Sequence, residues 1–169
     1  WLRNAEDSTV EINIVENNPI GILLGTNIGF GNTDPTLVKN SFSNASQGVA
    51  IKTTGNILTG NLVKKSVIGV AAGDNTDGNF IGRASGVPNV IADNTQGVGI
   101  GIFLGTLDLR VPETDLARNN TVENTLIGVN VIDETASPNT IGLVVTGAIQ
   151  NFIGGATEDS ALYICGSTT

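Results

Sequence analysis

Short apolar segments alternate with Asn- and Gly-rich stretches along the whole chain. An apolar or β-branched pair occurs five times, at 14–17, 37–40, 62–65, 90–93 and 121–124, followed by a polar residue in four of them and by Ala92 in the other, and usually then by Asn or Asp. A second apolar segment opens on a glycine in each repeat, at Gly21, Gly48, Gly69, Gly97 and Gly128. A third follows an asparagine, at positions 27, 56, 79 and 139, and again at 151. These patterns predict three short β-strands per repeat of roughly 22 to 30 residues.

The residue types favour a stack of strands in which each repeat covers the previous one. Val and Ile favour strands, whereas Asn and Gly tolerate the left-handed backbone of tight corners. No stretch shows a helical period over about ten residues, which argues against alternating strands and helices. Because stacked strands lie about 4.8 Å apart, Asn side chains at equivalent corners can hydrogen-bond in ladders. We expect five residues at stacked positions, Val15, Val38, Val63, Ile91 and Val122. An ordinary β-sandwich with Gly and Asn turns is the alternative.

Two parts of the chain carry recognisable motifs. The segments 79–94, with Asn-Phe-Ile-Gly followed by Asn-Val-Ile-Ala-Asp-Asn, and 151–155, Asn-Phe-Ile-Gly-Gly, resemble the repeats of right-handed parallel β-helix proteins. The resemblance is to the pectin-lyase-like superfamily and covers most of residues 10–155. It implies an all-β, right-handed parallel β-helix (a solenoid) of about six coils with three short strands per coil. Residues 1–169 would form this single domain, or a fragment of a longer chain. The family's functions range from polysaccharide lyases, hydrolases and epimerases to tailspikes, adhesins and inert surface proteins.

Charge and composition exclude several functions. The chain has 8 basic and 16 acidic residues, a net charge of −8, and a pI near 4.2. This balance disfavours nucleic acids and anionic membranes, which are bound by neutralising phosphate. No apolar run approaches the roughly 18 residues of a membrane-spanning helix, so we expect no membrane insertion. The chain has no His, which removes the commonest general base and zinc ligand. We therefore expect no cofactor and no metal.

The most tempting catalytic motif is Asn-Thr-Asp-Gly at 75–78. It matches a motif of polygalacturonases, which are similar β-helix enzymes that use paired aspartates. Those enzymes combine it with Asp-Asp, Gly-His-Gly and Arg-Ile-Lys sequences, and this chain has none of the three. Glycoside hydrolysis needs two carboxylates at a set separation, and the nearest later one, Asp93, is single. We interpret Asp77 as a turn residue.

Other charged residues give weaker signals. Asp74 and Asp77 precede a glycine as in a calcium loop, but the spacing fails the EF-hand pattern. The remaining interpretations are a solvated turn, which we favour, and a looser oxygen-ligand site built from the two aspartates. Arg110 and Arg118 are similar to the Arg-x-Pro-x-x-Arg of pectate lyases, but the second arginine lies too far along the chain to match the motif. The segment 107–119 is the longest insertion, and it is the best place for a binding function or is a surface loop.

The two ends of the chain bear on assembly. The chain starts at Trp1 and contains no Met, which indicates processing or truncation. No amphipathic helix precedes Ile14, and the apolar segment 161–165 is typical of a strand rather than a cap. Open strand edges pair with other strands. We therefore expect end-to-end self-association into filaments, with the single Cys165 near the junction, or a cap supplied by a longer parent chain.

Two functions follow from these observations. The first is a non-catalytic extracellular or cell-surface β-solenoid that acts as a structural, fibre-forming or adhesive module. The alternative is a polysaccharide-active enzyme, a lyase or hydrolase of uronic-acid polymers. Its candidate residues are Asp74, Asp77, Asp93, Arg110 and Arg118. The expected partners are further copies of the chain and a polysaccharide, although the acidic charge would repel a polyanion.

Overall fold

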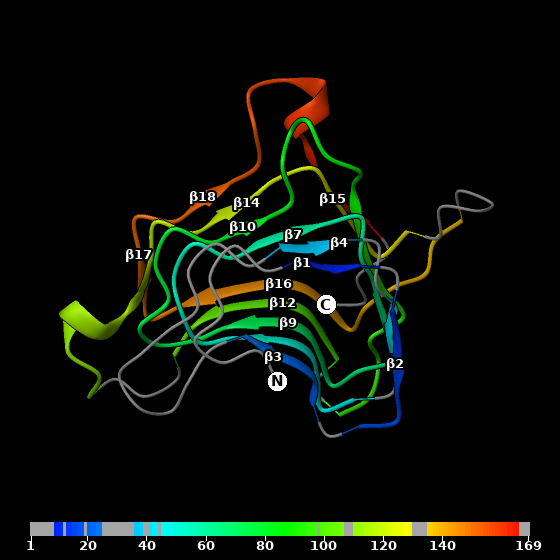
Figure 1. Cartoon of the computed structure of the whole chain (residues 1–169), viewed down its shortest axis with the longest axis horizontal. Helices are drawn as coiled ribbons and strands as arrows, with labels where there is room; N and C mark the ends of the chain where they lie inside the picture. Colours follow the sequence, from blue (N-terminus) through cyan, green and yellow to red (C-terminus); the bar gives the residue numbers. More distant parts are fainter. Residues whose placement is uncertain are drawn as a thin grey trace.

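The chain folds into parallel strands that lie in stacked sheets, an arrangement compatible with a β-helix-like solenoid (Figure 1). The computed structural model describes residues 9–11, 13–18, 20–24, 36–38, 41–43, 45–97, 99–106, 110–129 and 135–165. The chain visits three sheets in turn and then returns to the first, so each interior strand of these sheets pairs with strands from the preceding and following passes. The predicted all-β class with parallel pairing is confirmed.

The three main sheets are named here by the order in which the chain enters them. Sheet I contains β1 (Thr9–Glu11), β4 (Thr36–Val38), β7 (Ile57–Thr59), β10 (Phe80–Ile81), β14 (Thr121–Val122) and β18 (Phe152–Ile153). Sheet II contains β2 (Ile14–Glu16), β5 (Ser41–Ser43), β8 (Leu62–Lys64), β11 (Asn89–Ala92), β15 (Thr125–Ile127) and β19 (Leu162–Ile164). Sheet III contains β3 (Ile20–Leu24), β6 (Gln47–Ile51), β9 (Ile68–Ala72), β12 (Ile100–Gly105) and β16 (Ile141–Thr146).

A short strand pair and two 3-10 helices lie outside the three main sheets. Strands β13 (Ala117–Arg118) and β17 (Ala148–Ile149) form a short parallel pair. The 3-10 helix η1 (Glu113–Asp115) precedes β13, and η2 (Glu158–Ser160) precedes β19. Across the part of the chain that the structure covers, these two single turns are the only helices, and neither has the length or apolarity to span a bilayer.

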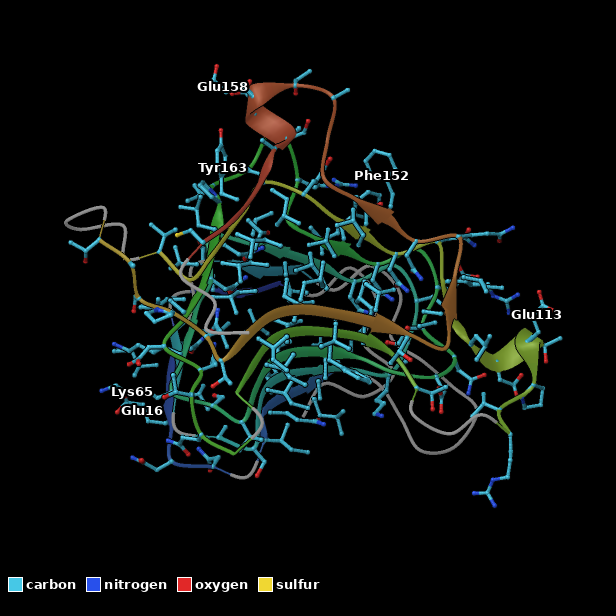
Figure 2. All side chains as sticks on the ribbon, turned by 180° about the vertical axis from the view of Figure 1, so that it is seen from behind. Glu16, Lys65, Glu113, Phe152, Glu158 and Tyr163 are labelled. Carbon is cyan, nitrogen blue, oxygen red and sulfur yellow. The ribbon has the colours of Figure 1, made fainter. Side chains whose placement is uncertain are left out.

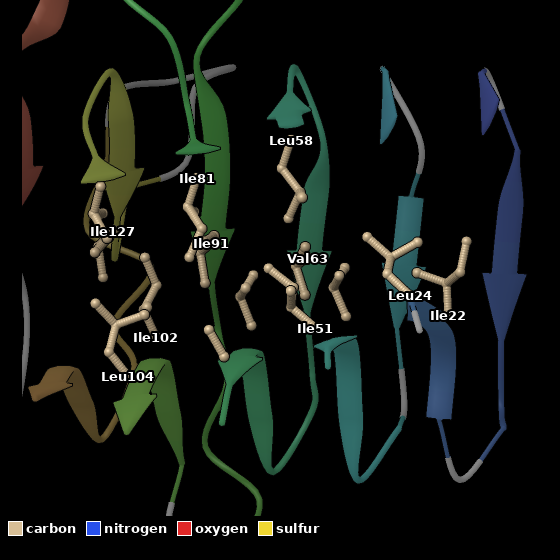
Figure 3. Packing of buried hydrophobic residues seen from close by; sticks show 14 residues of the cluster. Ile22, Leu24, Ile51, Leu58, Val63, Ile81, Ile91, Ile102, Leu104 and Ile127 are labelled. Carbon is tan, nitrogen blue, oxygen red and sulfur yellow. The ribbon is translucent and has the colours of Figure 1, made fainter. Parts of the chain in front are cut away.

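The core consists of columns of apolar side chains, one column per register position, that run across successive strands (Figure 3). In sheet I, Leu58, Ile81 and Val122 are aligned and at most 1% exposed. Each such residue packs between its counterparts in the layers on either side, so every interior layer depends on both neighbours. The other fully buried columns are Val63, Ile91 and Ile127 in sheet II, and Val49, Val70 and Ile102 with Ile51, Ala72 and Leu104 in sheet III.

The register corrects the predicted alignment of repeats. Val15, Val63 and Ile91 do share one column of sheet II. Val38 and Val122, however, lie in sheet I. The strands of sheets I and II follow one another closely and carry similar apolar pairs. The sequence pattern therefore matched the first strand of some passes with the second strand of others.

The glycine column of sheet III required the same correction. Gly48 and Gly69 are aligned as predicted, but the pairing of Ile100 with Ile141 makes Gly101 and Gly142 their counterparts, instead of Gly97 and Gly128. A Cβ atom on Gly69 would lie 2.5 Å from the carbonyl oxygen of Gly101. Glycine is therefore required because the neighbouring backbone approaches too closely for any side chain.

Asparagine ladders connect the passes at the corners, as predicted. In the first ladder, Asn79 Oδ1 accepts hydrogen bonds from the backbone N–H (2.8 Å) and Nδ2 (2.6 Å) of Asn56. Asn120 Oδ1 accepts the equivalent bonds from Asn79 at 3.1 and 2.7 Å. Asn151 Oδ1 accepts them from Asn120 at 2.9 and 3.0 Å. The first three residues of this ladder are fully buried, so the ladder supplies the partners that their polar groups need.

Two further ladders occupy the other corners. Asn89 Oδ1 accepts from the backbone and side-chain nitrogens of Asn61 at 3.0 and 3.1 Å. At the corner before sheet III, Asn94 Oδ1 accepts from the backbone of Ser66 at 2.9 Å, and Asn139 Oδ1 accepts from Asn94. The abundance of buried Asn in this chain is thus a requirement of its corners.

Candidate functional site

The structure brings two of the five candidate residues into direct contact. Asp77 lies in the connection between β9 and β10, and Arg118 lies in β13. Arg118 Nε is 3.5 Å from Asp77 Oδ2, and Asn119 Nδ2 donates to Asp77 Oδ1 at 2.9 Å. Both oxygens of the Asp77 carboxylate therefore face a donor within the protein. Because each side chain of the ion pair is more than a third exposed, solvent screens the pair.

This contact belongs to a network that attaches the long insertion to the corner before sheet I. Arg118 also donates from its backbone to Thr76 O (2.9 Å) and from its guanidinium to Thr114 O. Asn75 N donates to Asp115 O at 2.6 Å, which joins η1 to the same corner. Through these bonds Asp77 and Arg118 connect the insertion to this corner, and the interpretation of Asp77 as a turn residue stays a prediction.

Asp93 lies elsewhere. It follows β11 at the corner between sheets II and III, with a left-handed φ of 54°. Its backbone carbonyl accepts from Lys65 N at 3.1 Å, so the two residues share this corner. Figure 2 shows Lys65 on the opposite side of the molecule from Glu113 of η1. The five candidates therefore do not converge on one groove, and Asp93 does not pair with Asp77 as a second carboxylate.

Arg110 is exposed on the insertion, ahead of η1. Within the described residues, no group of three His, Cys, Asp or Glu side chains is placed to hold a metal ion.

Asp74, the remaining candidate, lines a cavity of about 440 Å³ on the outer face of sheet III. The floor is apolar and is formed by Ile68, Ala71, Ile100 and Phe103. Ala71 and Phe103 alternate with the core residues Val70, Ala72, Ile102 and Leu104, which places them on the outer face. The register aligns Ala71 with Phe103 in the adjacent strand, so a small side chain beside a ring leaves the hollow.

Polar groups border this floor at one end. Lys52 follows β6 and Asp74 follows β9, and both line the cavity. Asp74 Oδ1 is buried and has no hydrogen-bond partner among the described residues. Sequence reasoning missed Lys52 and Phe103 because neither belongs to a motif. Ala50, Ala71 and Phe103 occupy aligned positions on the outer face of three neighbouring strands, and the change from alanine to phenylalanine marks the hollow. This alignment can be recognised only once the strand register is known.

A second notable surface is the end of the stack formed by β16, β18 and β19. Ile153 is 40% exposed, whereas its register partner Val122 is fully buried. Ile164 is 46% exposed, whereas its partner Ile127 is fully buried. Phe152 and Tyr163 add exposed rings at the same end, near η2 (Figure 2). The exposed Cys165 lies beside them, and its Sγ donates to Gly128 O at 3.4 Å.

The fold and these sites define an all-β protein of parallel strands in stacked sheets, with an outer cavity and an apolar end. No family model matches the chain, and no curated protein or solved structure matches it either.

Proposed function

We propose that the chain is a right-handed parallel β-helix of about six coils, similar to the pectin-lyase-like superfamily, and that it acts without catalysis as an extracellular structural, fibre-forming or adhesive module. The rotation of the chain through sheets I, II and III supports the solenoid. The alignment of the first ladder over four consecutive passes supports the regular coil.

The observation that carries this proposal is the first Asn ladder together with the columns beside it. The layers that contain Asn56, Asn79, Asn120 and Asn151 are joined to one another by side-chain hydrogen bonds as well as by strand pairing. Such a body resists local opening because a layer cannot leave without orphaning buried donors in its neighbour. The charged candidates Asp77 and Arg118 already bind each other, and Asp77 also accepts a hydrogen bond from Asn119.

The experiment is a comparison of stability and activity on the same preparation. We expect a high unfolding midpoint and no release of reducing ends or unsaturated uronate from pectin, polygalacturonate or alginate. Depolymerisation of any of these polymers that is lost in Asp74→Asn at unchanged stability would overturn the non-catalytic proposal.

One observation favours the alternative, a polysaccharide-active enzyme. The Asp74 oxygen without a partner lies beside a cavity, which is where an acid or base would be placed. The enzyme would also need a second carboxylate at a set distance. Asp77 is held by Asn119 and Arg118, and Asp93 lies at another corner, so neither supports this function.

Self-association end to end is part of the proposal. The apolar columns that end at Ile153 and Ile164 would continue into Val10 and Val15 of a second copy, which occupy the same columns. Sedimentation and negative-stain microscopy at increasing concentration test this contact. Filaments that shorten in Ile153→Lys are expected. A particle that stays monomeric at high micromolar concentration, with no reductant-sensitive species through Cys165, would contradict it.

A further inference from the structure

The cavity on the outer face of sheet III has opposite charges at one end and an apolar floor. Lys52 and Asp74 follow neighbouring strands, β6 and β9, at the same edge of the sheet. Gly73 lies between them, and a Cβ atom on it would be 3.1 Å from Lys52 Nζ. The lack of a side chain at Gly73 therefore lets the ammonium group lie over the end of β9, at the residue that precedes Asp74 in the chain.

The two charges do not neutralise each other. Among the described residues, the ion pair that forms joins Arg118 and Asp77, and none of the described carboxylates lies within ion-pair distance of Lys52. Asp74 Oδ1 is buried in the same region and has no hydrogen-bond partner within the described part of the chain. A buried carboxylate oxygen without a donor is costly, which makes it a strong acceptor for a ligand's N–H group. Lys52 is exposed and offers three donors for a ligand's anionic group.

The apolar floor of the cavity determines which kind of side group the ligand would carry. Ile68 and Ile100 are aligned at one end of the strands, and Ala71 and Phe103 at the other. A side group that fills the hollow over Ala71 would pack against the Phe103 ring, an arrangement that aromatic and branched aliphatic groups favour. The net charge of the two polar groups is zero, which favours a ligand that is itself neutral but carries both charges.

We propose that this cavity binds a small zwitterion with an apolar side group, such as a free amino acid with an aromatic or branched side chain. The ligand's ammonium group donates to Asp74 Oδ1, its carboxylate accepts from Lys52 Nζ, and its side group lies on Ile68, Ala71, Ile100 and Phe103. The site is on the lateral face of sheet III, apart from the apolar end of the stack. It is thus independent of the proposed self-association.

The test is calorimetric titration of the full chain with L-phenylalanine. A ligand of about twelve non-hydrogen atoms binds in roughly the millimolar range at ordinary ligand efficiency. Two analogues each lack one charge: phenethylamine has no carboxylate and 3-phenylpropanoate has no ammonium group. We expect each to bind about tenfold more weakly or worse, because each leaves one charged partner without its contact.

Variants locate the site. Asp74→Asn and Lys52→Gln should each weaken L-phenylalanine binding about tenfold, whereas the matched controls Asp77→Asn and Lys64→Gln should leave it unchanged. The double variant Lys52→Asp/Asp74→Lys should recover part of the affinity, since it exchanges the two charges. Chemical shifts of the Gly73 and Gly105 amides should move on titration, and thermal unfolding checks that each variant is folded.

Three results would overturn the proposal. One is no binding of L-phenylalanine at about ten times the millimolar scale given above. Another is equal binding of 3-phenylpropanoate. The third is binding of a neutral oligosaccharide that is sensitive to Phe103→Leu while L-phenylalanine has no effect, because the cavity would then be a saccharide site.

Discussion

The middle of the stack and its β16–β19 end contain the same columns of residues in very different surroundings. Val63 and Ile164 occupy one column of sheet II, yet Val63 is 1% exposed and Ile164 is 46% exposed. Both are β-branched residues in three-residue strands. The difference shows that burial in this fold is conferred by the layers on each side. The energetic weight of a residue therefore depends on its layer more than on its identity.

A charge placed in the column should give the largest difference between the two regions. Val63→Asp should cost about 4 kcal/mol or more in free energy of unfolding, because an unpaired carboxylate would be buried between two layers. Ile164→Asp, in the same column, should cost less than about 1 kcal/mol. Urea unfolding followed by circular dichroism measures both. Similar losses for the two variants would show that the exposed end is covered in solution.

Removing a ladder residue should give the next largest effect. Asn79→Ala deprives the buried Asn56 N–H and the Thr53 carbonyl of their partners, at a cost of about 3 kcal/mol. Asn151→Ala, at the half-buried end of the same ladder, should cost about half as much because water can reach the site. The midpoint and slope of urea unfolding give this comparison. If Asn79→Ala were as stable as the natural chain, the ladder would contribute nothing to the free energy of unfolding.

Adding a methyl group should have different effects at two glycines, one where neighbouring layers approach closely and one in an open turn. Gly69→Ala should cost about 2 to 3 kcal/mol, since its Cβ would meet the Gly101 carbonyl and the layers would have to move apart. Gly78→Ala should cost only about 1 kcal/mol, because a Cβ atom added there has no described atom within 4 Å beyond its chain neighbours, and only the left-handed φ of 63° is unfavourable. Thermal unfolding ranks the two, and the reverse order would contradict the close approach of layers.

The smallest effect is expected at the exposed ion pair. Asp77→Asn should lower stability by less than about 1 kcal/mol, and the loss should shrink as salt is added. Unfolding at low and high ionic strength checks this. Arg118→Gln is the matched control and should behave alike. Loss of a polysaccharide-cleaving activity in Asp77→Asn at unchanged stability would instead show that the polygalacturonase-like motif is functional.

The sequence predicted the features that depend on local chemistry. Asn at the corners, Val and Ile in the strands and the lack of helical periodicity are properties of neighbouring residues, so the parallel all-β architecture and the ladders could be foreseen. The alignment of strands between successive passes could not be predicted. Leu37-Val38 and Leu62-Val63 look alike in sequence, but the first pair is in sheet I and the second in sheet II.

The candidate site was only partly predictable for the same reason. Asp74 was recognised as a candidate because it adjoins the 75–78 motif. Phe103 can be recognised as part of the cavity only when the register places it beside Ala71. The separation of Asp93 from Asp77 likewise follows from the number of strands between them within one pass. Contacts between passes depend on loop lengths, and these vary along the chain.

The first Asn ladder gives the molecule a polarity. In every step, the earlier residue donates from its N–H and Nδ2 and the later residue accepts at Oδ1. At the start of the ladder, Asn56 Oδ1 is buried and accepts no hydrogen bond from the described residues. The amide dipoles thus all point one way, as the strands do. Any further layer that continued the ladder would have to enter in the same orientation, and a layer added in the opposite orientation would break it.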